Sequence, residues 1–265
     1  MNIYTRPMKG EMDSFELIRE ISYKGKIGRE REEFCIQYTN YKRERLKETE
    51  IAQTKITAAN GEIVTCKKGC FSCCVLYTEA DIKECEAIVY YLYHNHDALS
   101  IFLEQYPKWR QKLREYGDLF RGCEQALREN RNGGYSIYNQ QVLADVLLSY
   151  KMQNILCPFL HNRLCMIYEV RPYTCANHYV TTPAKWCNPM SPNEPKVYKT
   201  NLNNEMLDLS FYYKRLSEPI IAFMPLAIYE ILKGGFSYLA NVTGLKSLEE
   251  EAMSDPEVRA IIQTS

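Results

Sequence analysis

The sequence lacks the motifs that define several large functional classes. It contains neither Gly-x-Gly-x-x-Gly nor Gly-x-x-x-x-Gly-Lys-Ser/Thr, so an ordinary nucleotide-binding or Rossmann-type methyltransferase site has no support. Its 33 basic residues equal its 33 acidic residues. A chain with no net charge gives no reason to expect nucleic acid or an anionic membrane surface as a partner.

Long hydrophobic stretches are also missing. The most apolar segment, 219–232, is too short to span a bilayer and contains Glu230. The N-terminal segment carries charges throughout, unlike a signal peptide. We therefore expect a cytoplasmic protein with no membrane partner, and the sequence leaves the oligomeric state open.

Cysteine is abundant, which is unexpected for a cytoplasmic protein. The chain has 11 cysteines, an odd number, and a reducing cytosol does not maintain a disulfide framework. Clustered cysteines in such a compartment more often bind metal or do chemistry. Three of them, Cys35, Cys85 and Cys123, are isolated within helical patterns, and we expect these to be packed as small hydrophobic side chains.

The other eight cysteines fall into two blocks. The first reads Cys-Lys-Lys-Gly-Cys-Phe-Ser-Cys-Cys over 66–74, where Gly69 permits a tight turn around a metal centre. The second covers 157–187 and begins with a Cys-Pro step, a recurring feature of iron–sulfur ligand runs. The sequence predicts metal ligands at Cys66, Cys70, Cys73, Cys74, Cys157, Cys165, Cys175 and Cys187.

These blocks resemble the cysteine-cluster family described as a putative zinc- or iron-chelating domain. That family's Cys-x-x-x-Cys-x-x-Cys-Cys run is matched by 66–74, and its Arg-Pro-x-x-Cys element by 171–175. Phe71 departs from the pattern, since glycine is common there. The family includes the flagellin lysine N-methylases, whose cysteine domain is associated with a [4Fe-4S] cluster. The resemblance implies a metal site and, less directly, a transferase that modifies a protein substrate.

The identity of the metal stays open at this point. Zinc and iron–sulfur clusters both accept an all-cysteine set. The spacing of Cys66, Cys70 and Cys73 is also that of radical S-adenosylmethionine enzymes, which leave one iron open for the cofactor. The rest of that class's pattern is absent, because the aromatic residue follows the second cysteine and no strand–helix alternation is visible. We expect a [4Fe-4S] cluster, with zinc as the alternative and S-adenosylmethionine as a candidate ligand.

Several residues near the cysteines are candidates for supporting roles. Lys67 and Lys68 would offset cluster charge, or else are solvated loop lysines, and Arg171 is expected to pair with a carboxylate or with backbone carbonyls. Adjacent Cys73 and Cys74 are expected to point apart, so that one could ligate while the other lines the site. His161 and His178 are expected to be hydrogen-bonded rather than ligating. Three tyrosines are predicted to shield the site from water: Tyr168, Tyr173 and Tyr179.

Helix dominates the remaining pattern. Apolar spacing, turns and caps predict helices over 12–23, 27–56, from the capping-box sequence 78–81 to Tyr93, 99–129, 138–152, 218–232 and 255–262. The helix over 99–129 is expected to be broken or bent at Pro107, and the helix over 218–232 to be ended by Gly234-Gly235. A short strand is expected within 196–209, and a short helix near 166–170. We predict a mainly α, irregular helical domain with few or no strands, organised around a cysteine-ligated metal site.

The sequence predicts a single domain. Residues 1–265 form one metal-binding domain with N-terminal helices over 1–58, a helical insertion over 75–156 and a C-terminal helical part over 193–265. No catalytic acid, base or nucleophile can be named apart from the cysteines.

Three function hypotheses remain at this point. One is an iron–sulfur protein with redox or protein-modifying chemistry, which needs a cleft beside the metal. The second is a non-enzymatic zinc module, structural or carrier, with every ligand position filled and no cleft. The third is a thiol switch at Cys73–Cys74, which would not require eight cysteines.

Overall fold

The structure, a computed structural model, describes residues 18, 29–132, 137–199, 220–244, 250, 253–254, 256 and 259–260. It is mainly helical with a few short antiparallel strands, which confirms the predicted fold class. The longer helices are α3 (Arg29–Ala59), α4 (Ile82–Tyr93), α5 (His96–Glu115), α6 (Gly117–Asn132), α7 (Ile137–Met152) and α9 (Met224–Thr243), with short turns of helix at α8 (Tyr173–Ala176), η1 (Tyr168–Val170) and η2 (Ala184–Cys187). No described helix combines the length and apolar character needed to cross a membrane.

The strands form two-stranded antiparallel sheets. They are β1 (Glu79–Asp81) with β6 (Ile221–Phe223), β2 (Leu160–His161) with β3 (Leu164–Cys165), and β4 (His178–Val180) with β5 (Val197–Lys199). The last pair confirms the strand expected within 196–209. Each sheet joins segments around the two cysteine blocks, so the strands serve mainly to position loops.

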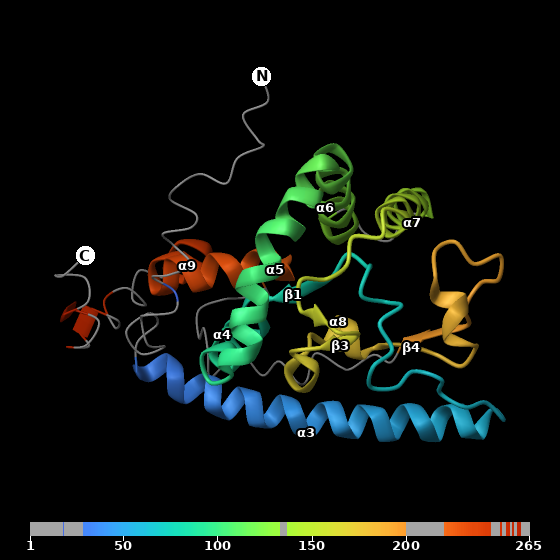
Figure 1. The fold of residues 1–265 in the computed structure, drawn as a ribbon, viewed down its shortest axis with the longest axis horizontal. Coiled ribbons are helices and arrows are strands. Elements are labelled where there is room, and N and C mark those ends of the chain that lie inside the picture. Colours follow the sequence, from blue (N-terminus) through green and yellow to red (C-terminus); the bar gives the residue numbers. More distant parts are fainter. Residues whose placement is uncertain are drawn as a thin grey trace.

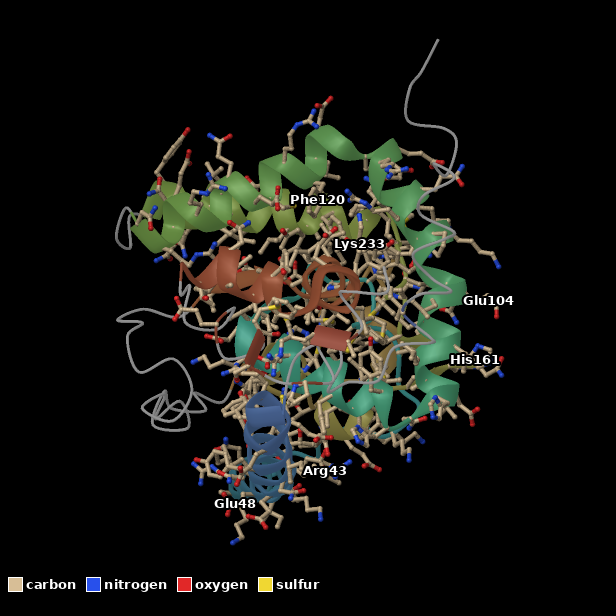
Figure 2. All side chains as sticks on the ribbon, turned by 90° about the vertical axis from the view of Figure 1, so that its left-hand side faces the viewer. Arg43, Glu48, Glu104, Phe120, His161 and Lys233 are labelled. Atoms are coloured by element: carbon tan, nitrogen blue, oxygen red, sulfur yellow. The ribbon has the colours of Figure 1, made fainter. Side chains whose placement is uncertain are left out.

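Helix α3 runs along one side of the molecule, beneath α4 and beneath the segment that carries α8, β3 and β4 (Figure 1). Its sequence is highly charged, and the exposed Glu48 points away from the rest of the molecule (Figure 2). Arg43 instead pairs with Glu169 at 3.4 Å. The opposite face of α3 is buried against α4, and Lys42 is fully buried there. The C-terminal half of α3 therefore reaches the cysteine-bearing segment.

Helix α4 lies at the centre of the core. It packs between α3 and α9, and its residues from Ile82 to Val89 are all buried. Beside it, Tyr77 stacks on Phe223 with ring centroids 4.2 Å apart, and Tyr106 stacks on Tyr229 at 4.1 Å. This aromatic packing fixes the chain that leaves the first cysteine block.

The start of α4 differs from the sequence prediction. The capping box is formed by Asp81 and Glu84, three residues beyond the expected Thr78. The reason is tertiary, because β1 pairs with β6 and holds 79–81 extended. Asp81 then accepts a hydrogen bond from the Lys83 N–H at 2.9 Å and begins the helix.

The helix is not broken at Pro107, where a break or a bend was predicted. Pro107 lies inside α5, and the chain leaves the helix at Tyr116, directly before Gly117. One proline removes a single helical hydrogen bond, and burial of Tyr106 and Trp109 on the same helix outweighs that loss.

Helix α9 begins later and ends later than predicted. Residues 221–223 form β6, and Gly235 (φ 55°, ψ −138°) kinks the helix without ending it. Leu239 and Ala240 are buried beyond the kink, so the helix resumes and stops at Gly244. The predicted helix at 12–23 lies outside the described residues apart from Ile18, and most of 255–262 lies outside them too.

Candidate metal centre

The first cysteine block is a loop fastened to β4. Thr65 donates its N–H to the Val180 carbonyl at 2.9 Å and its hydroxyl to the Thr182 carbonyl at 2.6 Å. In return, the Val180 N–H donates to Cys66 Sγ at 3.4 Å. Backbone N–H groups that donate to sulfur stabilise a metal-bound thiolate.

A tight turn follows Cys66. The Cys70 N–H donates to the Lys67 carbonyl at 2.9 Å, and Gly69 adopts φ 90°, which an L side chain rarely adopts. Phe71, the departure from the family pattern, lies under the Arg163 guanidinium at 4.8 Å. The aromatic ring therefore attaches this loop to the second block.

The second block begins with a β-hairpin. Asn162 and Arg163 both have positive φ (48° and 64°), as a two-residue type I′ turn requires. The turn folds β3 back on β2, so Cys165 returns to the neighbourhood of Cys157. A backbone hydrogen bond from the Cys157 N–H to the Cys74 carbonyl, 2.7 Å long, joins the two blocks.

Helix α8 carries Cys175 and is held from both sides. The Tyr173 N–H donates to Glu84 Oε1 at 2.9 Å, and Gln53 Nε2 donates to the Ala176 carbonyl at 3.0 Å. Glu84 also accepts from the buried Lys42 ammonium at 2.8 Å. Two core helices thus fix the position of this cysteine.

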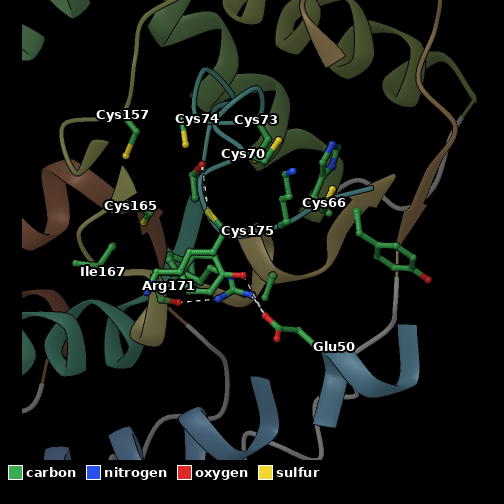
Figure 3. A pocket seen from close by; sticks show the side chains of 18 of the residues that line it. Glu50, Cys66, Cys70, Cys73, Cys74, Cys157, Cys165, Ile167, Arg171 and Cys175 are labelled. Atoms are coloured by element: carbon green, nitrogen blue, oxygen red, sulfur yellow. Dashed lines mark hydrogen bonds and ion pairs between the residues drawn. The ribbon is translucent and has the colours of Figure 1, made fainter. Parts of the chain in front are cut away.

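The arrangement brings seven of the eight predicted ligands to one cavity of about 510 Å³. Figure 3 shows them converging from the first loop, the hairpin and α8. They are Cys66, Cys70, Cys73, Cys74, Cys157, Cys165 and Cys175, each partly exposed to solvent. Cys187 does not line the cavity and is 8% exposed at the end of η2.

The predicted supporting residues divide between the cavity and other locations. Lys67, Lys68, Arg171, Tyr168, Tyr179 and His178 line the cavity. Tyr173 does not, because its ring lies over Lys42 Nζ at 5.0 Å. His161 lies 3.3 Å from Gln105 Nε2, as expected of a hydrogen-bonded histidine.

Cys35, Cys85 and Cys123 are fully buried in helices α3, α4 and α6. This confirms the predicted packing of these three isolated cysteines.

The side chains of the vicinal pair point in different directions, as expected: in Figure 3 Cys74 lies toward Cys157, and Cys73 lies beside Cys70. The interaction between the two thiols lowers the pKa of Cys73 and raises that of Cys74. Both residues line the cavity, where the loop turns and the Cys74 N–H donates to the Phe71 carbonyl.

The crowded thiols favour the neutral form without a cation. Burial, and then the charge of neighbouring thiols, raises the pKa of Cys157 to about 12 and that of Cys66 to about 11. Backbone N–H groups oppose this, from Phe159 at Cys157 and from Ile167 at Cys165. A bound metal cation reverses such repulsion and holds the sulfurs as thiolates, so the chemistry of the donor set fits a metal centre.

A single-ion site and a cluster place different demands on the positions of the sulfurs. Among the described residues, no three His, Cys, Asp or Glu side chains lie close enough together to hold one metal ion. A tetrahedral zinc with sulfurs at about 2.3 Å needs them roughly 3.8 Å from each other. An iron–sulfur cluster accepts a wider set, because each cysteine binds a different iron.

Helix α3 supplies residues that the sequence did not suggest. Glu50, Gln53 and Thr54 line the cavity opposite the cysteines. They lie in a long charged helix with no distinctive motif, so no local signal marks them. These three residues of α3 form the wall of the cavity that faces the cysteines.

Comparison with known proteins gives no match to any family model, curated protein or solved structure. The resemblance to the cysteine-cluster family therefore stays a prediction that depends on the cysteine pattern.

Proposed function

We propose that this protein binds an iron–sulfur cluster through its two cysteine blocks and does redox or protein-modifying chemistry in the adjoining cavity. The observation that carries the proposal is the convergence of seven cysteines, from blocks far apart in the sequence, on one cavity. Inert packing does not require partly exposed thiols to gather in this way.

A cluster is favoured over a single zinc ion by the arrangement of the thiols. Among the described residues they line a cavity without any three donors close enough together for one metal ion. His178 also lines the cavity, whereas His161 lies beside Gln105 and does not. Soft thiolate sets of this kind suit iron–sulfur clusters as well as zinc, so the arrangement is the discriminating feature.

Chemistry beyond a structural role is supported by the cavity itself. Its volume of about 510 Å³ falls within the range of small-molecule sites. Its far wall is polar, formed by Glu50, Gln53 and Thr54 of α3, with the cations Lys67 and Lys68 also lining it. A bound cluster would supply one-electron transfer to a molecule held there.

The resemblance to lysine methylases suggests a transferase acting on a protein substrate, with S-adenosylmethionine as a candidate ligand of the cavity. A closed zinc module, structural or carrier, is the competing hypothesis. It predicts that all protein ligands close on the metal and leave no adjacent space.

Anaerobic reconstitution with iron and sulfide separates these hypotheses. We expect a brown protein with broad visible absorption and equal amounts of iron and acid-labile sulfide. A colourless protein that retains stoichiometric zinc and takes up no iron would contradict the proposal. The Cys123→Ala variant is the matched control, since Cys123 is buried in α6 away from the cavity.

A further inference from the structure

The eight cysteines outnumber the ligands of one cluster, and four of them form an inner group. The Cys157 N–H bonds to the Cys74 carbonyl at 2.7 Å, and the β2–β3 hairpin returns Cys165 beside Cys157. Cys175 Sγ lies 4.0 Å from the Thr78 hydroxyl, just beyond the first block. Figure 3 shows the side chains of these four cysteines facing a common space.

The remaining four belong to a different part of the site. Cys66 is fixed at β4 by the Val180 N–H, and Cys70 belongs to the turn that follows it. Cys187 is the last residue of η2, which follows β4 within a few residues along the chain. In Figure 3, Cys66, Cys70 and Cys73 lie together, on the side of the cavity away from Cys157 and Cys165.

The charges of neighbouring thiols agree with this grouping at every residue except Cys73. Cys70 and Cys73 act on Cys66 and on Cys187, and Cys187 acts on Cys66. Within the inner group, Cys157 and Cys165 act on Cys74 and Cys175. Cys73 acts on all four inner thiols as well.

Cys73, which directly precedes Cys74, is assigned to the outer group by counting ligands. The inner group already contains four thiols without it, which is the number that one [4Fe-4S] cluster takes. The outer group contains three without it: Cys73 lies beside Cys70 in Figure 3, and its charge acts on Cys66 and Cys187. Because Cys73 and Cys74 are consecutive residues, the two groups lie next to each other.

We infer that the eight cysteines form two adjacent four-thiolate cluster sites. The inner site consists of Cys74, Cys157, Cys165 and Cys175, and the outer site of Cys66, Cys70, Cys73 and Cys187. This inference rests on the proposed function, since it divides the same cysteines between two clusters. Two neighbouring clusters would allow an electron to pass between the outer site and the inner site.

Iron counting with matched variants tests the division. Wild-type protein, reconstituted anaerobically, should bind about eight irons and about eight sulfides, since each [4Fe-4S] cluster carries four of each. Cys187→Ser, from the outer group, and Cys165→Ser, from the inner group, should each retain about half. Electron paramagnetic resonance of the fully reduced wild type should show coupling between two clusters, and this coupling should vanish in both variants.

The outcomes distinguish this inference from the proposed function. About four irons in the wild type, abolished by one variant and unaffected by the other, would overturn two sites while leaving an iron–sulfur protein. A wild type that takes up no iron would overturn both. Circular dichroism checks that each variant is folded, and Cys70→Ser with Cys157→Ser provides an independent pair with the same expected result.

Discussion

Arg171 donates from Nη2 to Glu50 Oε1 and from Nη1 to the Tyr168 carbonyl, each at 2.7 Å. Its guanidinium also lies 3.8 Å from the centre of the Tyr168 ring. A single side chain thus ties the second cysteine block to α3 at the wall of the cavity. The planar, multidentate guanidinium is suited to this, whereas a lysine ammonium is not.

The first prediction concerns this link. Arg171→Lys should lower the free energy of unfolding by about 1–2 kcal/mol, because lysine keeps the charge but loses one hydrogen bond and the stacking. Urea denaturation of the metal-free protein measures the change. Arg128→Lys, at an exposed position on α6, is the control and should change stability little. Equal effects from the two variants would contradict a specific role for Arg171.

The second prediction concerns the buried Lys42–Glu84 ion pair, whose side chains are 0% and 6% exposed. Lys42→Met should cost about 3–5 kcal/mol, because it leaves a buried carboxylate without its cation. Adding Glu84→Gln should recover part of that loss, since the neutral amide oxygen still accepts from the Tyr173 N–H. A double-mutant cycle in urea measures the coupling between the two positions.

The exposed pair Arg121–Asp118 is the control for that cycle. Arg121→Met should change the free energy of unfolding by less than about 0.5 kcal/mol. If Lys42→Met were as mild as Arg121→Met, the position of α8 and Cys175 would not depend on the buried pair.

The third prediction concerns Gly69, in the loop of the first cysteine block. Gly69→Ala should destabilise the loop by about 1–2 kcal/mol, because φ 90° is strained for any residue with a Cβ. Space is not the cause, since the added Cβ would meet only Leu164 Cδ2 at an ordinary 3.8 Å. Iron content after reconstitution should fall in this variant. Gly117→Ala, at the start of α6, should leave iron content unchanged.

The fourth prediction concerns pH and Glu62, which follows the end of α3. Hydrogen bonds from Lys196, from Tyr198 Oη at 2.6 Å and from Thr181 Oγ1 at 2.8 Å lower its pKa from 4.5 to about 2. Because the folded pKa is below the unfolded one, this stabilisation is complete above pH 4.5 and is lost as the pH falls toward 2.

Glu62→Gln should therefore be less stable than wild type at pH 7, and the difference should shrink as the pH falls below 4.5. Guanidinium denaturation at a series of pH values measures it. Glu115→Gln, an exposed residue at the end of α5, should show no such convergence. A difference independent of pH would mean that Glu62 acts through packing instead of charge.

The sequence predicted the mainly helical fold, and it also indicated residues that the structure brings together. The short spacings within 66–74, and the Cys-Pro and Arg-Pro steps, are local features, and seven of the eight cysteines they indicated line one cavity. Local periodicity also predicted α3 and α7 closely. Errors arose where distant partners decide the structure, as when β6 holds 79–81 extended and delays α4.

What the sequence could not indicate depends on packing between distant segments. Glu50 and Gln53 lie within one charged helix, and their place in the cavity is apparent only once α3 lies beneath α8 (Figure 1). Tyr173 was expected at the cavity, but the buried cation of Lys42 draws its ring toward α3. The division of eight cysteines into two groups likewise requires the three-dimensional arrangement.

X-ray absorption at the iron and zinc edges of anaerobically purified protein tests the central claim most directly. We predict iron with sulfur neighbours and a second shell of iron neighbours, which a cluster has and a mononuclear site lacks. Zinc with four sulfurs at about 2.3 Å, and no iron, would contradict the account and identify a closed zinc module.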